Sequence, residues 1–292
     1  MNLIPSAHSR ISPTAKFVAY FRQMSDIPYS KDIVDVFDVE SSFQQLFMPN
    51  NKVMYGDIFA PLLEIRYKSI QYAIEQANIT QVLEFASGIS LRGLAMTKDP
   101  NLTYVETDLP ELNQEKIDLL STLMKRNNIK TRANLFFHAV NVLNVDEIES
   151  ALRHFSVHKP LAIVHEGLFQ YLTRDEKKQA AKNIHRLLER YGGIWMTPDL
   201  DTQSSFHAHL FSQSQSQEMM SLIKNLTGRD FMQNAFQDEG DVMAFFKDLG
   251  FAVSWQPQMN ENISLSTLNT KHINQEVLDA LNKLRLWNLK VA

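Results

Sequence analysis

The chain has 292 residues, of which 44% are hydrophobic and 21% charged, and its formal net charge is −4. These values are those of an ordinary globular protein and suit one large α/β domain or two small ones. The lack of a basic run argues against a nucleic-acid partner, because phosphate binding needs clustered Lys and Arg. Without cysteine, disulfides, cysteine–zinc sites and thiol catalysis are excluded. Residues 1–10 hold no apolar signal segment and no run is long enough to span a bilayer, so we expect a cytoplasmic protein without a membrane partner.

Helical patterns come first along the chain, over residues 1–78. Ser12-Pro13 is typical of a helix start, Ser30 can cap a second helix, and a third segment places apolar residues on one face. From residue 80 the period changes, and short apolar runs alternate with helical patterns. The runs are expected at 81–85, 102–106, 135–140, 161–165 and 194–197, and the helices near 90–98, 111–126, 145–156 and 173–190. This alternation predicts a parallel sheet that is covered on both faces.

The pattern changes again after residue 199. Residues 201–240 are rich in Ser and Gln, and we interpret their His207 and His209 as solvated rather than catalytic. Helical patterns return at 219–226 and 242–249. Two further strands are expected at 251–255 and 285–290, with a helix at 275–284 between them, and such strands can pair antiparallel at the sheet edge.

The most informative stretch lies at the end of the first expected strand. An apolar run carries Glu84, a small-residue turn around Gly88 follows, and a helical pattern opens directly after the turn. Small residues let the backbone approach a ligand, and the helix N-terminus offers free N–H groups. The next run ends in Glu106 and Asp108, where an acid can accept hydrogen bonds from ribose hydroxyls. The order of the two runs indicates a nucleotide-type site, although Glu84 and Asp108 could also be a turn residue and a helix start.

Glu166 follows a third apolar run, which we expect to be a central strand. Open α/β sheets bind ligands at the carboxyl ends of such strands. A carboxylate there is costly to bury unless a cation compensates it. We therefore interpret Glu166 as functional, and the preceding His165 as a core histidine.

Four sequence blocks together resemble one enzyme family. Residues 86–92, Ala-Ser-Gly-Ile-Ser-Leu-Arg, stand where that family has Gly-Ala-Gly-Leu-Asp-Thr-Arg. Residues 106–110 and Lys116 resemble its Glu-x-Asp-x-Pro block and the lysine after it, and Asn141-Val142 stands at an Asp-Leu pair. Residues 165–172 resemble its Glu-Gly-Leu-x-x-Tyr-Leu block closely. The chain thus resembles the leucine carboxyl methyltransferase family of class I S-adenosylmethionine-dependent methyltransferases, which also contains polyketide O-methyltransferases.

The resemblance implies an α/β fold: a Rossmann-like, mostly parallel class I methyltransferase sheet with an antiparallel C-terminal edge strand. An N-terminal helical cap and a helical lid insertion would complete it. We expect one methyltransferase domain, with the cap at 1–78, the cofactor-binding core at 79–200, the lid at 201–240 and a helix and strand pair at 241–292. The implied cofactor is S-adenosyl-L-methionine, and no metal is expected.

The nucleoside end of the cofactor is assigned by position within the family blocks. Gly88 and its turn would pass under the methionine part. Asp108 would hold the ribose hydroxyls, with Glu106 as the second choice. Asn141 would contact the adenine amine, since its carbonyl oxygen can accept a hydrogen bond.

The amino-acid end is assigned in the same way. Glu166 would face the cofactor's amino group, and Arg66 and Lys16 resemble an arginine and an N-terminal lysine that hold its carboxylate. The complete set of expected cofactor-binding residues is Lys16, Arg66, Glu84, Ala86, Gly88, Glu106, Asp108, Asn141, Val142, Glu166 and Gly167.

The expected reaction is O-methylation of a small molecule at a hydroxyl or carboxyl group. A carboxylate needs no base, a phenol or alcohol benefits from one, and the sequence designates no catalytic residue. Three alternatives stay open: a protein carboxyl methyltransferase, a non-catalytic cofactor-binding protein on a degenerate methyltransferase core, and an NAD-dependent oxidoreductase. Ala86 and Ser90 in place of glycines keep the second alive, whereas the missing G-x-G-x-x-G fingerprint argues against the third. The oligomeric state is not predicted.

Overall fold

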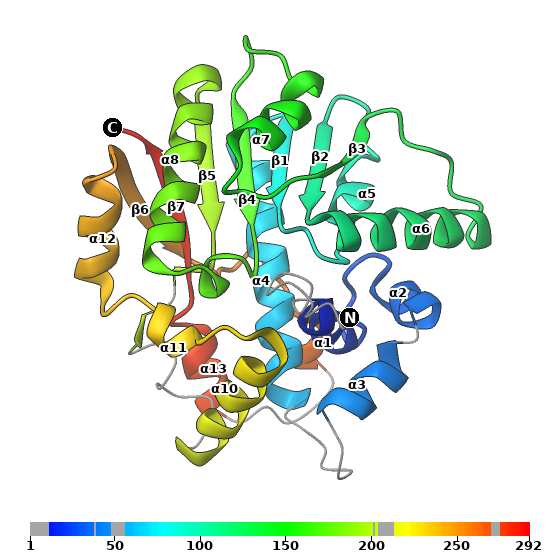
Figure 1. Cartoon of the computed structure of the whole chain (residues 1–292). Helices are drawn as coiled ribbons and strands as arrows, with labels where there is room; N and C mark the ends of the chain where they lie inside the picture. Colours follow the sequence, from blue (N-terminus) through cyan, green and yellow to red (C-terminus); the bar gives the residue numbers. More distant parts are fainter. Residues whose placement is uncertain (1–11, 38, 48–55, 201, 204–212, 270–274) are drawn as a thin grey trace, which may run out of the picture.

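The computed structural model describes residues 12–37, 39–47, 56–200, 202–203, 213–269 and 275–292. Its centre is a seven-stranded sheet of order β3-β2-β1-β4-β5-β7-β6 (Figure 1). Strands β1 to β5 pair in parallel, whereas β7 pairs antiparallel with both β5 and β6. The strands are β1 (Gln81–Phe85), β2 (Thr103–Asp108), β3 (Leu135–Ala139), β4 (Leu161–His165), β5 (Gly193–Thr197), β6 (Phe251–Pro257) and β7 (Arg285–Val291). The predicted fold class is confirmed, including the antiparallel edge.

Helices cover both faces of the sheet and one of its ends (Figure 1). The helices before the sheet are α1 (Ser12–Arg22), α2 (Ser30–Phe37), α3 (Val39–Phe47) and α4 (Gly56–Ala77). Those between the parallel strands are α5 (Arg92–Met96), α6 (Pro110–Arg126), α7 (Val145–Ala151) and α8 (Arg174–Tyr191). The remaining ones are α10 (Gln213–Thr227), α11 (Phe231–Asn234), α12 (Glu239–Lys247) and α13 (Gln275–Leu281). Figure 1 shows α1, α3, α10 and α11 below the carboxyl ends of the parallel strands, where the site is expected.

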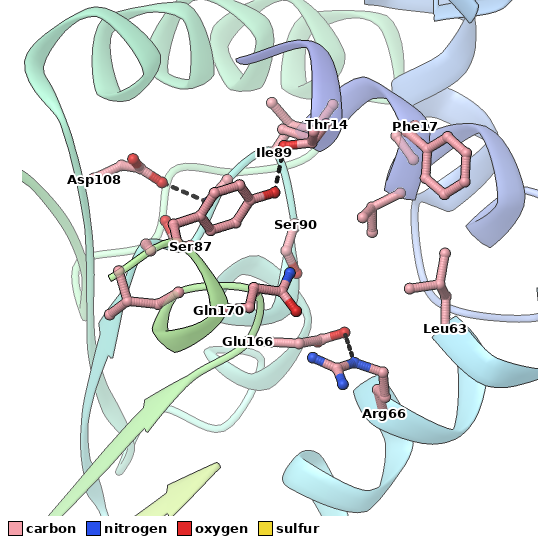
Figure 2. Close-up of a pocket in the computed structure, with 18 of the residues that line it drawn as sticks. Thr14, Phe17, Leu63, Arg66, Ser87, Ile89, Ser90, Asp108, Glu166 and Gln170 are labelled. Carbon is pink, nitrogen blue, oxygen red and sulfur yellow. Dashed lines mark hydrogen bonds and ion pairs between the residues drawn. The ribbon is translucent and has the colours of Figure 1, made fainter. Parts of the chain in front are cut away.

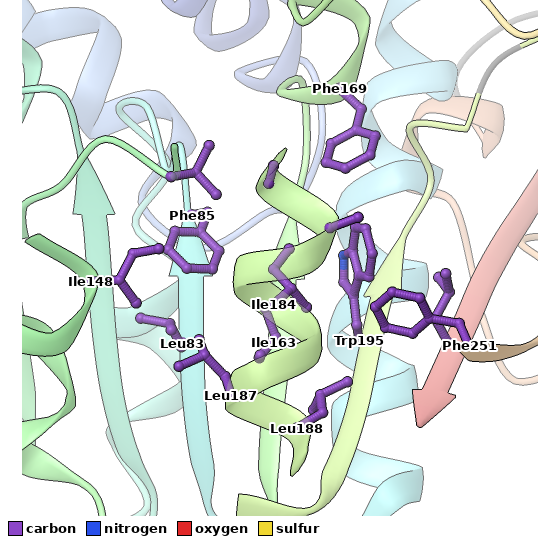
Figure 3. Close-up of a cluster of buried hydrophobic side chains, with 14 of the residues drawn as sticks. Leu83, Phe85, Ile148, Ile163, Phe169, Ile184, Leu187, Leu188, Trp195 and Phe251 are labelled. Atoms are coloured by element: carbon purple, nitrogen blue, oxygen red, sulfur yellow. The ribbon is translucent and has the colours of Figure 1, made fainter. Parts of the chain in front are cut away.

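The alternation of side chains along each strand divides the core into two layers. On one face Leu83, Phe85, Ile163 and Trp195 pack against α7 and α8 (Figure 3). On the other face the neighbouring strand residues pack against α4, α5 and α6. Helix α4 spans both regions, because its second half packs on the sheet and its first half joins an aromatic cluster with α1 and α3. This helix therefore connects the core of the sheet with the core of the helical cap.

The observed elements follow the predicted ones closely, with two additional helices, α3 and α11. Helix α8 lies where a helix was predicted; a capping box between Thr173 and Glu176 starts it, and Gly192 ends it with a φ of 67°. The sequence patterns did not predict α3. The region predicted as a lid contributes α10 and α11, whereas His207 and His209 lie outside the described residues. Within the described ranges no helix has both the length and the apolarity that crossing a membrane requires.

Candidate active site

The turn after β1 brings the backbone close to the carboxyl ends of β1 and β2. Ala86 and Gly88 both adopt left-handed φ values, of 49° and 54°. Such a conformation is strained for alanine and unstrained for glycine. The Gly88 N–H donates to Asp108 Oδ2 at 2.7 Å, so the turn is held against the end of β2.

The two acids at the end of β2 have different environments. Asp108 lines the pocket and accepts a second hydrogen bond, 2.8 Å long, from the Leu109 N–H. Glu106 is enclosed, with Lys116 Nζ 2.5 Å from its Oε2 and the Gly93 N–H donating to its Oε1 at 2.8 Å. Burial raises the pKa of both acids, and the bonds named here partly offset that rise. Only Asp108 of the pair lines the pocket, so the ribose assignment, which stays a prediction, concerns Asp108 rather than Glu106.

Arg92 connects the first strand to the Glu166 loop. Its Nε lies 3.2 Å from Glu84 Oε1 and its Nη2 lies 3.1 Å from Glu166 Oε2, while its Nη1 donates to the Tyr67 carbonyl oxygen at 2.6 Å. Tyr104 also donates to Glu84, through its hydroxyl at 2.7 Å. Arg92 is fully buried, so both carboxylates have the cation that burial demands.

Glu166 is surrounded by three arginines from three elements. Besides Arg92, its Oε1 lies 2.6 Å from Arg22 Nη2 of α1 and 3.4 Å from Arg66 Nε of α4. Burial alone would raise the pKa of Glu166, but the three positive charges outweigh burial and lower it. Glu166 is therefore a carboxylate at neutral pH, at the carboxyl end of β4 beside β1.

Asp199, just beyond β5, holds the loop that carries Glu166. It accepts hydrogen bonds from the Gly167 N–H at 2.9 Å and the Leu168 N–H at 2.7 Å, and it forms an ion pair with Arg66. His165 Nδ1 lies 2.9 Å from the same carboxylate. These contacts keep the pKa of Asp199 well below its usual range despite burial. Asp199 thus positions Arg66 and the backbone after Glu166.

These groups surround one cavity of about 360 Å³, a volume within the usual range for small-molecule sites. Figure 2 shows Asp108 and Ser87 on one side, Phe17 and Leu63 on the opposite side, and Glu166 with Arg66 between them. Nine of the predicted cofactor-binding residues line it: Arg66, Glu84, Ala86, Gly88, Asp108, Asn141, Val142, Glu166 and Gly167. Lys16 and Glu106 are not among the lining residues.

Asn141 lies in this lining but is also part of a local turn. Its Oδ1 accepts the Leu143 N–H at 3.0 Å, and its own N–H donates to Glu147 Oε2 at 2.6 Å. A carbonyl oxygen has two lone pairs, so Oδ1 keeps the capacity to accept from an adenine amine. The adenine assignment stays a prediction.

The far side of the cavity is apolar and comes from the helical cap and the lid region. Its side chains belong to α1, α4, α10 and α11: Phe17, Val18, Phe59, Leu62, Leu63, Met220, Ile223 and Phe231. The hydroxyl of Tyr171 lies 2.7 Å from Thr14 Oγ1, which ties α1 to the loop after β4. The pocket therefore has a polar half at the strand ends and an apolar half under the helices.

Two residues of this site were not predicted from the sequence. Arg22 lines the pocket and Asp199 orders it, yet neither belongs to a block with a family match. Asp199 could have been predicted, because it is an acid that follows a predicted strand, and the same pattern identified Asp108 and Glu166. Within the described ranges no group of three metal-binding side chains is found.

Comparison with known proteins identifies the fold. Residues 65–185, less than half of the chain, match the family model of the leucine carboxyl methyltransferases. The structure of a DUF574 family protein from Streptomyces avermitilis MA-4680 is similar over 95% of this chain and 96% of that one, with a TM-score of 0.55 and 14% identity. The methyltransferase domain of bacterial-CtHen1-C is similar over 79% and 99%, with a TM-score of 0.50 and 10% identity. No curated protein matches the chain significantly.

The chain has the fold of the class I methyltransferases. Its central region matches the family model of the leucine carboxyl methyltransferases. This match supports methyltransferase activity with S-adenosyl-L-methionine as the cofactor. The residues present fit that molecule, because the Asp108 and Glu166 carboxylates line the pocket and would accept hydrogen bonds from its hydroxyl and ammonium groups.

Proposed function

We propose that the protein transfers a methyl group from S-adenosyl-L-methionine to an oxygen atom of a small, largely apolar molecule. The observation that carries the proposal is the division of the pocket. The carboxylates of Asp108 and Glu166 line one side, and apolar side chains of α1, α4, α10 and α11 line the other. The second half has the character of a site for an organic acceptor, since such sites are mostly apolar with few polar groups.

The cofactor, when bound, supplies a methyl group activated by its sulfonium. The chain would contribute alignment, because holding donor and acceptor in line lowers much of the barrier to transfer. Asp108 would fix the nucleoside end of the cofactor, and the Gly88 turn, Glu166 and the arginines would fix the methionine end. Helices α1 and α10 would keep water from the reacting atoms. We propose no catalytic base.

A turnover assay tests this proposal. The purified protein is incubated with S-adenosyl-L-methionine labelled in the methyl group and a panel of apolar phenols, alcohols and carboxylic acids, and methylated products are identified by mass spectrometry. Product formation with a member of the panel supports the proposal, and the identity of the acceptor shows whether a hydroxyl or a carboxyl group is used.

The same assay separates the alternatives. Methylation of protein carboxyl tails, with none of the small molecules, would replace the proposal by a protein carboxyl methyltransferase. Binding of S-adenosylhomocysteine without turnover of any acceptor would favour a non-catalytic protein, and Ala86 with its strained φ is the feature that supports this second candidate. We also propose a cytoplasmic location, since a chain without cysteines shows none of the disulfides common in secreted proteins.

A further inference from the structure

Arg22 and Tyr67 line the pocket, and each has a buried hydrogen-bond donor without a partner among the described residues. The Arg22 side chain is 9% exposed, and although its Nη2 lies 2.6 Å from Glu166 Oε1, neither Nη2 nor Nε has a hydrogen bond of good geometry to a described residue. Tyr67 is 1% exposed, and its hydroxyl likewise has no partner in the described part of the chain. The Arg22 guanidinium carbon lies 5.3 Å from the centre of the Tyr67 ring. Nη2 is thus ion-paired with Glu166, whereas Arg22 Nε and the Tyr67 hydroxyl are buried donors without a partner in the described ranges, on two side chains that line the same pocket.

Donors of this kind indicate what the pocket binds. Most buried polar groups in proteins are hydrogen-bonded, and the exceptions concentrate at functional sites. Burial raises the pKa of Tyr67 to about 12, so its hydroxyl keeps its proton and donates. A guanidinium only donates and its planar fork matches a carboxylate. The complementary group is therefore an anionic oxygen pair rather than a neutral or cationic group.

The neighbouring carboxylate narrows the ligand further. Arg22 contacts Glu166 directly, so a cation and an anion stand side by side at the same end of the pocket. An α-amino acid group carries a carboxylate and an ammonium on adjacent atoms, which matches this arrangement. A zwitterion also adds no net charge, so the charge balance of the pocket is kept when it binds.

We propose that Arg22 and Tyr67 bind the carboxylate of the methionine end of the cofactor, while Glu166 binds its ammonium. The inference rests on the proposed function. Arg22 would turn its unpaired N–H groups to the ligand, and Glu166 would stay compensated because Arg66 and Arg92 remain at 3.4 and 3.1 Å. Arg22 thereby takes the role that the family resemblance gave to Arg66 and Lys16, because Arg66 pairs with Glu166 and Asp199 and Lys16 does not line the pocket.

Calorimetric titration of the full chain with two ligands tests the assignment. S-adenosylhomocysteine carries the amino-acid group, and 5′-methylthioadenosine has the same nucleoside without it. The variants are Arg22→Gln, Tyr67→Phe and Lys16→Gln. Arg190→Gln is the matched control, because Arg190 is half-exposed, does not line the pocket, and contacts Glu149 and the Tyr191 ring. Thermal unfolding of each variant shows that it is folded.

Arg22→Gln should weaken S-adenosylhomocysteine binding at least about tenfold, or about 1.4 kcal/mol, and change methylthioadenosine binding less than about twofold. Tyr67→Phe removes a single hydroxyl and should give a smaller loss, also confined to the first ligand. Arg190→Gln should bind both ligands as the wild type does.

Three results would overturn the inference. Arg22→Gln and Tyr67→Phe could both bind S-adenosylhomocysteine as tightly as the wild type. Arg22→Gln could lose affinity for both ligands equally, which would mean that the native Arg22 side chain only holds α1 in place. Lys16→Gln could show the selective loss that we expect of Arg22→Gln. Failure of the wild type itself to bind S-adenosylhomocysteine would instead refute the proposed function, so the two failures are distinguishable.

Discussion

Replacing Glu166 by Gln should reduce both the stability of the protein and its cofactor binding. After the change Arg66 keeps Asp199 and Arg92 keeps Glu84, whereas Arg22 has no second ion pair within the described residues. Removing one partner of a buried ion pair costs about 3–5 kcal/mol. Two of the three arginines still contact another carboxylate, and the amide oxygen of Gln still accepts hydrogen bonds. We therefore expect the free energy of unfolding to fall by the lower end of this range, about 3 kcal/mol.

The assay is thermal unfolding by calorimetry, alongside titration with S-adenosylhomocysteine. At roughly 2–4 °C per kcal/mol for a protein of about this size, the melting temperature should fall by roughly 6–12 °C. The double variant Arg22→Gln/Glu166→Gln should lose less stability than the sum of the single losses, because no unpaired charge is left at that contact. A shift below about 1 kcal/mol for Glu166→Gln, or additive losses in the double variant, would refute the reasoning.

The remaining predictions concern acid stability, the ribose site, the turn and the lid. Folding lowers the pKa of Glu166 below its unfolded value of about 4.5. The charged carboxylate therefore stabilises the protein above about pH 4.5, and this stabilisation is lost as the pH falls through the folded pKa. The melting temperatures of wild type and Glu166→Gln should approach each other as the pH falls from about 4.5. Asp108→Ala should weaken S-adenosylhomocysteine binding by about 1.5–3 kcal/mol, and an unchanged dissociation constant in a folded variant would exclude the ribose assignment. Positions 86 and 88 both have left-handed φ, which favours glycine over alanine. Gly88→Ala should therefore lower the free energy of unfolding by about 1 kcal/mol, whereas Ala86→Gly should leave it unchanged or raise it by up to about 1 kcal/mol. Equal losses for the two variants in denaturant titrations would contradict this. Amides of 213–234 should exchange faster than those of the parallel strands and slow when cofactor and an acceptor are added, and protection equal to that of the strands would exclude a mobile lid.

Much of the fold could be predicted because local sequence determines it. The apolar runs of β1 and β4 are bounded by polar and small residues, and their observed limits are those expected. Helix α8 carries its own start signal in the Thr173 capping box. Helix α3 was not predicted, because its stability comes from burying Val39 and Phe43 against α1 and α2, a contact between separate elements.

The same distinction applies to the site. Asp108 and Glu166 lie at strand ends, so the sequence pattern alone places them at the ligand edge of the sheet. Glu106 has the same local signal, but Lys116 of α6 encloses it, and no strand pattern shows that contact. Arg22 is one cation at the end of an amphipathic helix, and its burial depends on how α1 packs against the pocket. Roles that depend on contacts between elements were therefore beyond sequence reasoning.

The position of β7 has a consequence for how the sheet is assembled during synthesis. β6 leaves the ribosome before β7, yet its only strand partner in the sheet order is β7. β6 therefore joins the sheet only when β7 lies between it and β5. In that position Leu286, Trp287 and Leu289 of β7 are buried. An exposed strand edge is prone to pair with other chains. We therefore expect a chain in which β7 is not yet in place to expose a strand edge that can pair with other chains.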